Sequence, residues 1–321
     1  MYVISEQVAA SIGSIEATIP LVERAFADFA RGDASLLPIA IGKGLDPSTS
    51  FGAKGGTIRG LGLVGVKIGS YFPGNADKGL LAHGSTTVLL DPDTGVPVAL
   101  IGAVCLSAIR TAALDAIAVR LLSRPDSSSL ALIGTGYQAW WDLSAIIATR
   151  PIERLLVWNR TRSSAEQFAI RASREYGIDA QAVDIETAAR NADIIVTATA
   201  SRDALIERKW VRAGTHISAI GADNPGKQEL ATDLVAASTL YADLTEQSIT
   251  LGEFEAAYAQ GLVKQSEITP IGAVIVGEAA GRAADEITIF DTSGTALQDL
   301  AIAKVVLETA LAQNLTVTID V

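Results

Sequence analysis

The chain has 321 residues, of which 49% are hydrophobic and 5% are aromatic, and its formal net charge at pH 7 is -11. Such a length allows two domains, and a core of Ala, Val, Ile and Leu is usual where parallel strands are buried. The negative charge argues against nucleic acid or an anionic membrane as a partner, and the lone cysteine, Cys105, excludes a disulfide within the chain.

Metal ligands and targeting segments are scarce in the sequence. His83, His216 and Cys105 supply the nitrogen and sulfur ligands, and they lie far apart, so we expect no metal site. The longest apolar run, Val98–Leu106, is too short to cross a bilayer, and the N-terminus has no basic segment typical of a signal peptide. These features predict a soluble cytoplasmic protein.

The first third of the chain predicts helix, then mostly antiparallel strands, then helix. Apolar residues at helical spacing predict a helix within 5–32, with a boundary or kink at Pro20. The further expected elements are a loop or edge strand at 36–50, a strand at 61–70, a covering loop at 71–83, a hairpin at 85–101 and a helix at 105–122. The hairpin turns at Asp91-Pro-Asp-Thr-Gly95, and turn geometry explains its two aspartates without any catalytic role.

From residue 129 onward, expected strands alternate with expected helices. The strands are 129–133, 153–158, 181–183, 193–199, 215–221 and 239–242, and the helices between them include 137–148 and 185–192. Ser163 and Glu166 have the spacing of a capping box, which predicts a helix from there to Tyr176. Such alternation indicates a doubly wound parallel sheet. A long helix at 295–313 and a last strand at 315–321 are expected to return to the first domain.

The segment Ile133-Gly-Thr-Gly-Tyr-Gln-Ala139 has the pattern of a dinucleotide-binding turn. Gly134 permits the tight turn, Gly136 permits close approach of the backbone to a phosphate, and Ala139 takes the place of the third glycine. The helix that begins here offers unpaired N–H groups and its positive dipole end to a pyrophosphate. Because the motif ends the first strand of the alternating region, we expect a Rossmann domain.

The end of the next expected strand indicates which dinucleotide binds. NAD-binding sites usually have Asp or Glu at this position, whereas this chain has Asn159-Arg-Thr-Arg162. Guanidinium groups would bind a 2′-phosphate that a carboxylate would repel. The sequence therefore predicts NADP(H) in preference to NAD(H).

Four blocks of the sequence together resemble the ornithine cyclodeaminase and mu-crystallin family. They are Arg110-Thr-Ala-Ala113, Ile133–Ala139, Ile220–Leu230 and Phe290–Asp299, and the similarity runs from about Lys54 to the helix near Leu311. The resemblance implies an α/β protein in which a Rossmann domain, 116–299, is inserted in a substrate-binding and dimerisation domain, 1–115 and 300–321. It also implies a homodimer, with the active site between the two domains.

The resemblance implies roles for single residues. Lys67 and Arg110 match a lysine and an arginine at the substrate carboxylate, Asp223 matches a catalytic acid, and His83 matches a histidine that contacts ligands. The cofactor-binding positions are Thr111, Gly134, Gly136, Gln138, Ala139, Asn159, Arg160, Thr161, Thr197, Ala198, Thr199, Ile220 and Ser293. Without a functional role, Lys67 on its apolar strand would be a costly inward charge or an ordinary outward one. Arg110 near a helix start opposes the dipole, and a nearby anion would explain it.

The chain departs from the family at one carboxylate-binding position. Many members have an arginine where this sequence has Ile41, and Lys54 is the candidate replacement. The segment 52–56 and the Asp-Pro hairpin resemble the iminosuccinate reductases more than the ornithine enzymes.

Together these features predict a reversible NAD(P)H-dependent reductase that converts a small α-imino acid into an L-amino acid. Lys67 and Arg110 would fix the carboxylate, and Asp223 would favour the iminium by proton donation or as a counter-charge. Lys54 and His83 would add positive charge for a second carboxylate, which favours iminosuccinate as substrate. Three alternatives remain open: an ornithine cyclodeaminase that uses NAD catalytically, an alanine or opine-type dehydrogenase, and a mu-crystallin-like protein that binds a ligand and NADPH.

Overall fold

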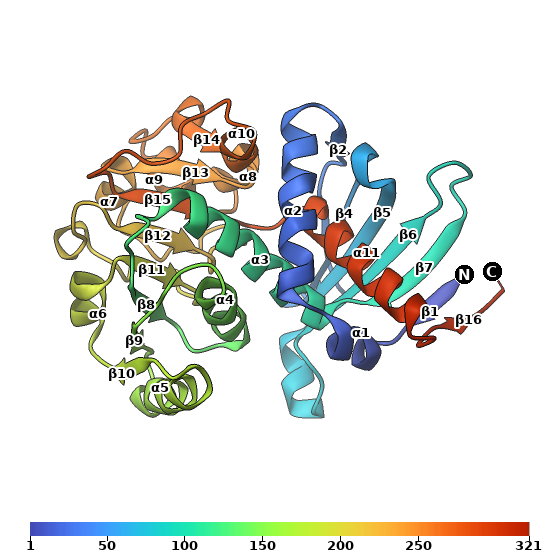
Figure 1. Ribbon diagram of the computed structural model, residues 1–321, viewed down its shortest axis with the longest axis horizontal. Coiled ribbons are helices and arrows are strands. Elements are labelled where there is room, and N and C mark those ends of the chain that lie inside the picture. Colours follow the sequence, from blue (N-terminus) through green and yellow to red (C-terminus); the bar gives the residue numbers. More distant parts are fainter. Residues whose placement is uncertain (321) are drawn as a thin grey trace. The chain divides into compact units, whose positions relative to one another are not determined.

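The computed structural model describes residues 1–320, and the chain divides into two compact units (Figure 1). The first unit contains Met1–Ala113 and the C-terminal segment from Thr295, and the second contains Leu114–Gly294. In the described residues, no helix is long and apolar enough to cross a membrane.

The first unit is built on a mostly antiparallel sheet. Its strand order is β16-β1-β7-β6-β5-β4-β2, and β3 pairs with β4. The strands are β1 (Tyr2–Ile4), β2 (Ala34–Leu36), β3 (Ala40–Lys43), β4 (Ser50–Ile58), β5 (Leu63–Tyr71), β6 (His83–Leu90), β7 (Pro97–Gly102) and β16 (Val317–Thr318). The helical elements are α1 (Glu6–Ile12), α2 (Ile15–Ala30), η1 (Arg59–Leu61), η2 (Pro73–Lys78) and α11 (Ala296–Ala312). The boundary between the units falls within α3 (Val104–Leu122).

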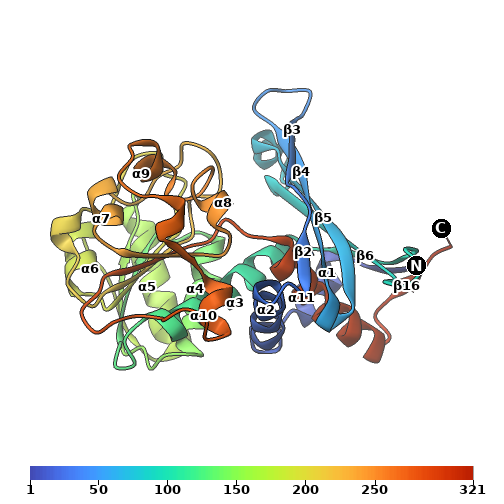
Figure 2. The ribbon, with the colours of Figure 1, turned by 90° about the horizontal axis from the view of Figure 1, so that it is seen from above.

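Helices cover one face of this sheet. Figure 2 shows α2 and α11 on the same side of β4 and β5. Alternation along β5 buries Leu63, Gly65 and Lys67 on this side and exposes half of Ile68 on the other. A Cβ atom at Gly65 would lie 2.8 Å from Leu300 of α11, so the glycine lets the helix approach the sheet closely. The covered face therefore carries Lys67.

The second unit is a parallel sheet with the order β10-β9-β8-β11-β12-β15-β13-β14. The strands are β8 (Ser129–Ile133), β9 (Arg154–Trp158), β10 (Asp179–Ala182), β11 (Ile194–Thr197), β12 (His216–Ala219), β13 (Thr239–Ala242), β14 (Ile268–Pro270) and β15 (Thr288–Asp291). The helical elements are α4 (Tyr137–Ile147), α5 (Arg162–Tyr176), α6 (Ile185–Asn191), η3 (Arg208–Trp210), α7 (Thr232–Ala236), α8 (Thr245–Ser248), α9 (Glu255–Ala259), η4 (Gln265–Glu267) and α10 (Ile271–Ile275).

The strand β8 is apolar after its first residue because both faces of the sheet are buried at this strand. Along β8, Ala131 and Ile133 belong to one apolar cluster, and Leu130 and Leu132 belong to another on the opposite face. Alternation between two cores explains the continuous apolar run Leu130–Ile133. The expected α/β class with a doubly wound parallel sheet is confirmed by this topology.

Three local predictions were wrong. Pro20 lies inside α2, which continues past it because Val22 and Phe26 are fully buried along the helix. The helix α5 begins at Arg162, not at a capping box formed by Ser163 and Glu166, and Glu166 instead accepts a hydrogen bond from Arg162 Nε at 3.0 Å. The expected last strand is reduced to β16, which pairs with β1, and Val321 lies outside the described residues.

Candidate functional site

Most of the predicted cofactor residues lie along the carboxyl edge of the parallel sheet, whereas Thr111 lies in α3. β8 lies between β9 and β11, and all three strands run in the same direction. The residues that directly follow β8, β9, β11 and β12 are Gly134, Asn159, Ala198 and Ile220. The chain leaves β8 toward β9 on one side and reaches β11 on the other, which is the point where open α/β sheets bind ligands.

The two glycines after β8 have different structural requirements. Gly134 has φ +113°, and a Cβ atom there would lie 2.6 Å from the carbonyl oxygen of Ala198. Gly136 has φ -74° and caps α4, and a Cβ atom there would meet nothing within 4 Å. The fold therefore needs glycine at 134. It does not need glycine at 136, where the space beside the backbone is open and lies at the N-terminus of α4. This arrangement fits the pyrophosphate of a dinucleotide.

The helix that follows this turn is anchored through its first residues. Ala139 is completely buried in the cluster between α4 and the sheet, as a residue that packs helix on strand must be. Gln138 Nε2 donates to Asp142 Oδ1 at 2.7 Å. Both residues thus lie on α4, one turned into the core and one bonded along the helix.

The segment after β9 presents basic and amide side chains. Asn159 Nδ2 donates to the carbonyl oxygen of Thr161 at 3.3 Å, and Thr161 is the N-cap residue of α5. Arg160 is exposed, whereas Arg162 is engaged with Glu166 along the helix. Arg160 is therefore the guanidinium of this segment best suited to a phosphate.

A buried carboxylate, Glu229, ties two strand ends together. Its Oε1 accepts hydrogen bonds from the backbone N–H and the hydroxyl of Thr199, both at 2.7 Å, and its Oε2 accepts one from Gly221 N at 2.9 Å. Burial raises the pKa of Glu229. Thr199 and Gly221 follow β11 and β12, so Glu229 fixes the loops at the predicted cofactor edge. The sequence reasoning did not single out this residue.

Of three other predicted cofactor residues, one is buried and two are hydrogen-bonded within the protein. Thr197 is the buried last residue of β11. Ser293 Oγ donates to Gln247 Oε1 at 3.2 Å, and Thr111 Oγ1 donates to the carbonyl oxygen of Ser107 at 2.9 Å within α3.

Lys67 and Arg110 meet at one buried carboxylate in the first unit. Lys67 Nζ donates to Asp299 Oδ1 at 2.8 Å, and Arg110 Nε lies 3.0 Å from the same oxygen. Arg110 Nη1 also donates to Gln298 Oε1 at 2.9 Å. The helix α11 thus supplies an anion beside both cations. Asp299 ended one of the four resembling blocks, but its role was not predicted.

Lys54 and His83 lie on the same face of the sheet as Lys67. Lys54 is directly opposite Lys67 in the β4–β5 ladder, and His83 is opposite Tyr71, whose ring centroid lies 4.8 Å from that of the imidazole. Tyr71 is four residues from Lys67 along β5, so alternation turns both to one side. Like charges directly opposite each other are unfavourable, and an anion beside Lys54 and Lys67 would relieve the repulsion.

The electrostatics of this cluster suit proton exchange and anion binding. Burial lowers the pKa of Lys67 to about 8, and Arg110 and Lys54 add to the decrease while Asp299 opposes it. Burial alone would raise the pKa of Asp299, but the charges of Lys67 and Arg110 outweigh burial and lower it. Asp299 is therefore a stable anion, and Lys67 is a cation that can release its proton near pH 8.

Asp223 has a local partner that the sequence reasoning did not predict. It follows β12 and is exposed, and its Oδ1 accepts hydrogen bonds from Lys227 Nζ at 2.6 Å and Asn224 Nδ2 at 2.9 Å. Lys227 Nζ also donates to the carbonyl oxygen of Gly221 at 3.1 Å. Asp223 is thus held near the end of β12 by these contacts.

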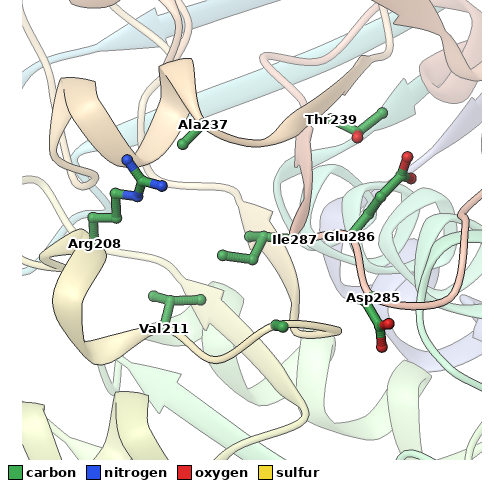
Figure 3. Close-up of a pocket in the computed structure, with 8 residues that line it drawn as sticks. Arg208, Val211, Ala237, Thr239, Asp285, Glu286 and Ile287 are labelled. Carbon is green, nitrogen blue, oxygen red and sulfur yellow. The ribbon is translucent and has the colours of Figure 1, made fainter.

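A separate hollow lies at the opposite edge of the parallel sheet. Figure 3 shows Arg208, Asp285 and Glu286 around a pocket of about 270 Å³, where Thr239 begins β13 and Ile287 precedes β15. None of the predicted site residues lines it. In the described part of the chain, no group of three or more His, Cys, Asp and Glu side chains is arranged to hold a metal ion.

A parallel sheet with a glycine turn at its switch point defines a dinucleotide-binding protein of the Rossmann type. The chain belongs to the ornithine cyclodeaminase/mu-crystallin family, whose model matches residues 3–314.

Several proteins similar to this chain are named as reductases or dehydrogenases of imino or amino acids. The iminosuccinate reductase of Paracoccus denitrificans (strain Pd 1222) is 36% identical over 313 residues, which cover 97% of each chain. A crystal structure of a Paracoccus denitrificans iminosuccinate reductase with NAD⁺ has a TM-score of 0.96 and 34% identity over 100% of this chain and 99% of that one.

Two further solved structures are similar over nearly the whole chain. An archaeal alanine dehydrogenase dimer with bound NAD has a TM-score of 0.95 and 34% identity over 100% of this chain and 99% of that one. The Δ1-pyrroline-2-carboxylate reductase of Thermococcus litoralis, in complex with NADH and L-proline, has a TM-score of 0.94 and 29% identity over 99% of this chain and 100% of that one. The relatives thus include NAD-binding enzymes of imino and amino acids.

Proposed function

We propose that this protein is an NAD(P)H-dependent reductase that converts a small α-imino acid into an L-amino acid. The observation that carries the proposal is the cluster of Lys67 and Arg110 on Asp299, with Lys54 directly opposite Lys67. Such a cluster binds anions, and the relatives whose names specify a reaction act on imino or amino acids that carry a carboxylate.

Three charged side chains have proposed roles in the reaction. Arg110 and Lys67 bind the α-carboxylate and thereby fix the position of the imine carbon, and such positioning supplies several kcal/mol of barrier reduction. A reduced nicotinamide cofactor held at the turn of Gly134 and Gly136 would supply the hydride. Asp223 stabilises the iminium by proton donation or as a counter-charge, which makes the carbon a better hydride acceptor.

We propose iminosuccinate as the preferred substrate. The charges of Arg110 and Lys54 both act on Lys67, so three cations gather in this cluster. Three cations favour a dianion over a monoanion. The similarity to iminosuccinate reductase supports the same choice.

A panel of 2-oxo acids with ammonium tests the reaction and its rivals. With NADPH or NADH, we expect oxidation of the cofactor with oxaloacetate at a kcat/KM at least tenfold above that with pyruvate. The reverse order would indicate an alanine dehydrogenase. Release of ammonia from ornithine without net change at 340 nm would indicate a cyclodeaminase, and tight NADPH binding without any turnover would indicate a binding protein.

We propose that NADP(H) is preferred over NAD(H), because Arg160 is exposed after β9 and no acidic side chain stands at residues 159–162. Replacing Arg160 with aspartate should therefore lower kcat/KM for NADPH by at least tenfold and leave that for NADH within threefold, because a carboxylate repels the 2′-phosphate. The measurement is initial rates with both cofactors. A wild-type preference for NADH above tenfold would contradict the proposal. The three similar structures described above contain NAD⁺, NAD or NADH.

We propose that the first unit, predicted at 1–115 and 300–321, is the substrate and dimerisation domain and that the second, predicted at 116–299, is the cofactor domain; residues 295–299, Asp299 included, belong to the first unit. The sheet face opposite Lys67 supports a homodimer, because its side chains on β5, β6 and β7 are largely apolar and could pack against a second copy. It carries Val64, Val66, Ile68, Val88 and Leu100, all at least partly exposed. The alanine dehydrogenase relative is a dimer.

Replacing Ile68 with glutamate should convert the dimer into a monomer at micromolar concentration, because the change places a charge in the proposed interface. Light scattering after size exclusion measures the mass. The matched control is Ile170→Glu, at an exposed position of α5, which should leave the mass unchanged. A dimer that survives Ile68→Glu would rule out this face.

A further inference from the structure

Asp299 is the point at which three elements converge. It lies in the first turn of α11 and is 2% exposed, and its Oδ1 is shared by Lys67 of β5 and Arg110 of α3. Its Oδ2 is buried without a hydrogen-bond partner in the described part of the chain. The carboxylate is thus oriented by the two cations.

The start of α11 is itself fixed against α3. Thr295 N donates to Gln298 Oε1 at 2.8 Å in a capping box, and Arg110 Nη1 donates to the same amide oxygen at 2.9 Å. Arg110 therefore has two anchors on one helical turn, a neutral oxygen and a charged one. Such a double contact fixes the plane of the guanidinium group.

We propose that Asp299 is a positioning residue that holds the Lys67 ammonium and the Arg110 guanidinium on one oxygen, so that both direct their remaining N–H groups at the same substrate carboxylate. The inference rests on the proposed function for the identity of that ligand. Asp299 acts through its two partners and need not touch the substrate.

The same contact determines when Lys67 loses its proton. The groups that face Lys67 are Asp299 from α11, Arg110 from α3 and Lys54 from β4, and His83 of β6 lies farther along the same face. Burial and the two cations lower the pKa of Lys67 to about 8, and Asp299 alone of the groups acting on it raises this pKa. Removing the carboxylate charge must therefore lower the pKa further.

Competitive acetylation of the intact protein measures this ionisation without any substrate. Acetic anhydride reacts with the neutral amine, forms an amide and releases acetate, and mass spectrometry follows labelling of Lys67 against pH. We expect a midpoint near pH 8 in the wild type and a midpoint at least one pH unit lower in Asp299→Asn. The matched control is Glu308→Gln, a carboxylate on the same helix that pairs with Lys304, and it should keep the wild-type midpoint.

Kinetics test the positioning role itself. Asp299→Asn should raise KM for the imino acid by at least 30-fold near pH 7.5 and move the basic limb of the kcat/KM profile to lower pH. Asp299→Glu keeps the negative charge but shifts the carboxylate oxygen. It should therefore retain the labelling midpoint of Lys67 and raise KM about tenfold. This variant also tests the positioning role if Asp299→Asn does not fold.

The outcomes separate the inference from the proposed function. An unchanged labelling midpoint in Asp299→Asn, or unchanged KM in Asp299→Glu, would overturn the role of Asp299. If the wild type turns over no imino acid but the midpoint moves as expected, the proposed function fails, and Asp299 remains the residue that governs Lys67.

Discussion

Replacing Lys67 with methionine will lower kcat/KM for the imino acid by about a thousandfold, which corresponds to roughly 4 kcal/mol of transition-state stabilisation. The substitution removes one of the two cations at the carboxylate and any proton that Lys67 supplies. Methionine has a similar length and suits a buried position. Arg110 still lies beside the buried carboxylate of Asp299, which therefore keeps one cation. The fold should persist for this reason.

Steady-state kinetics with a thermal unfolding scan would check this result. Lys304→Met is the matched control, since Lys304 lies on the surface of α11 and pairs with Glu308 at 2.6 Å. The control should keep kcat/KM within twofold of the wild type. A Lys67→Met enzyme within threefold of the wild type would remove Lys67 from the mechanism.

Replacing Gly136 with valine will weaken NAD(P)H binding by at least about a hundredfold while changing stability by less than about 1 kcal/mol. The backbone at Gly136 has φ -74°, which valine adopts, and the added carbon meets no protein atom within 4 Å. The side chain would instead fill the space proposed for the pyrophosphate. Fluorescence titration with NADPH and urea unfolding measure the two quantities.

Gly134→Ala is the contrasting variant for the same turn. At φ +113° an alanine is strained, and its Cβ would lie 2.6 Å from the carbonyl oxygen of Ala198. We expect a loss of roughly 3 kcal/mol in the free energy of unfolding.

If Gly136→Val binds cofactor as the wild type does, the pyrophosphate does not lie against this turn.

The central strands of the parallel sheet could be predicted well from the sequence because they are buried on both faces. The strands β8 and β13 are largely apolar or β-branched runs with clear ends, and both were predicted with their observed bounds. The glycine pattern after β8 could be recognised in the sequence because the turn needs glycine at 134, where φ is positive.

The antiparallel sheet was harder to predict because glycines interrupt its alternation. β4 was missed, and Gly52 and Gly56 within it have no side chain to show the period. A Cβ atom at either glycine would lie 2.5 Å from a carbonyl oxygen, of Ala40 or Ser35 respectively. The glycines thus permit close pairing with β3 and β2, a requirement that is invisible without the neighbouring strands.

The cations of the candidate site could be recognised in the sequence, but their counter-ion could not. Lys67 and Asp299 are separated by 232 positions, and nothing local marks an aspartate in the first turn of a helix as more than a favourable dipole partner. Glu229 escaped notice for the same reason, because its partners Thr199 and Gly221 become neighbours only when β11 and β12 pair.

Following a deuterium label from the cofactor into the product tests the proposed hydride transfer. NADPH with both C4 hydrogens replaced by deuterium is incubated with the enzyme, oxaloacetate and ammonium, and the amino acid is examined by mass spectrometry. We expect L-aspartate with one deuterium at Cα and an equal amount of NADP⁺. Aspartate without deuterium, or oxidation of NADPH without any amino acid product, would contradict the proposed transfer.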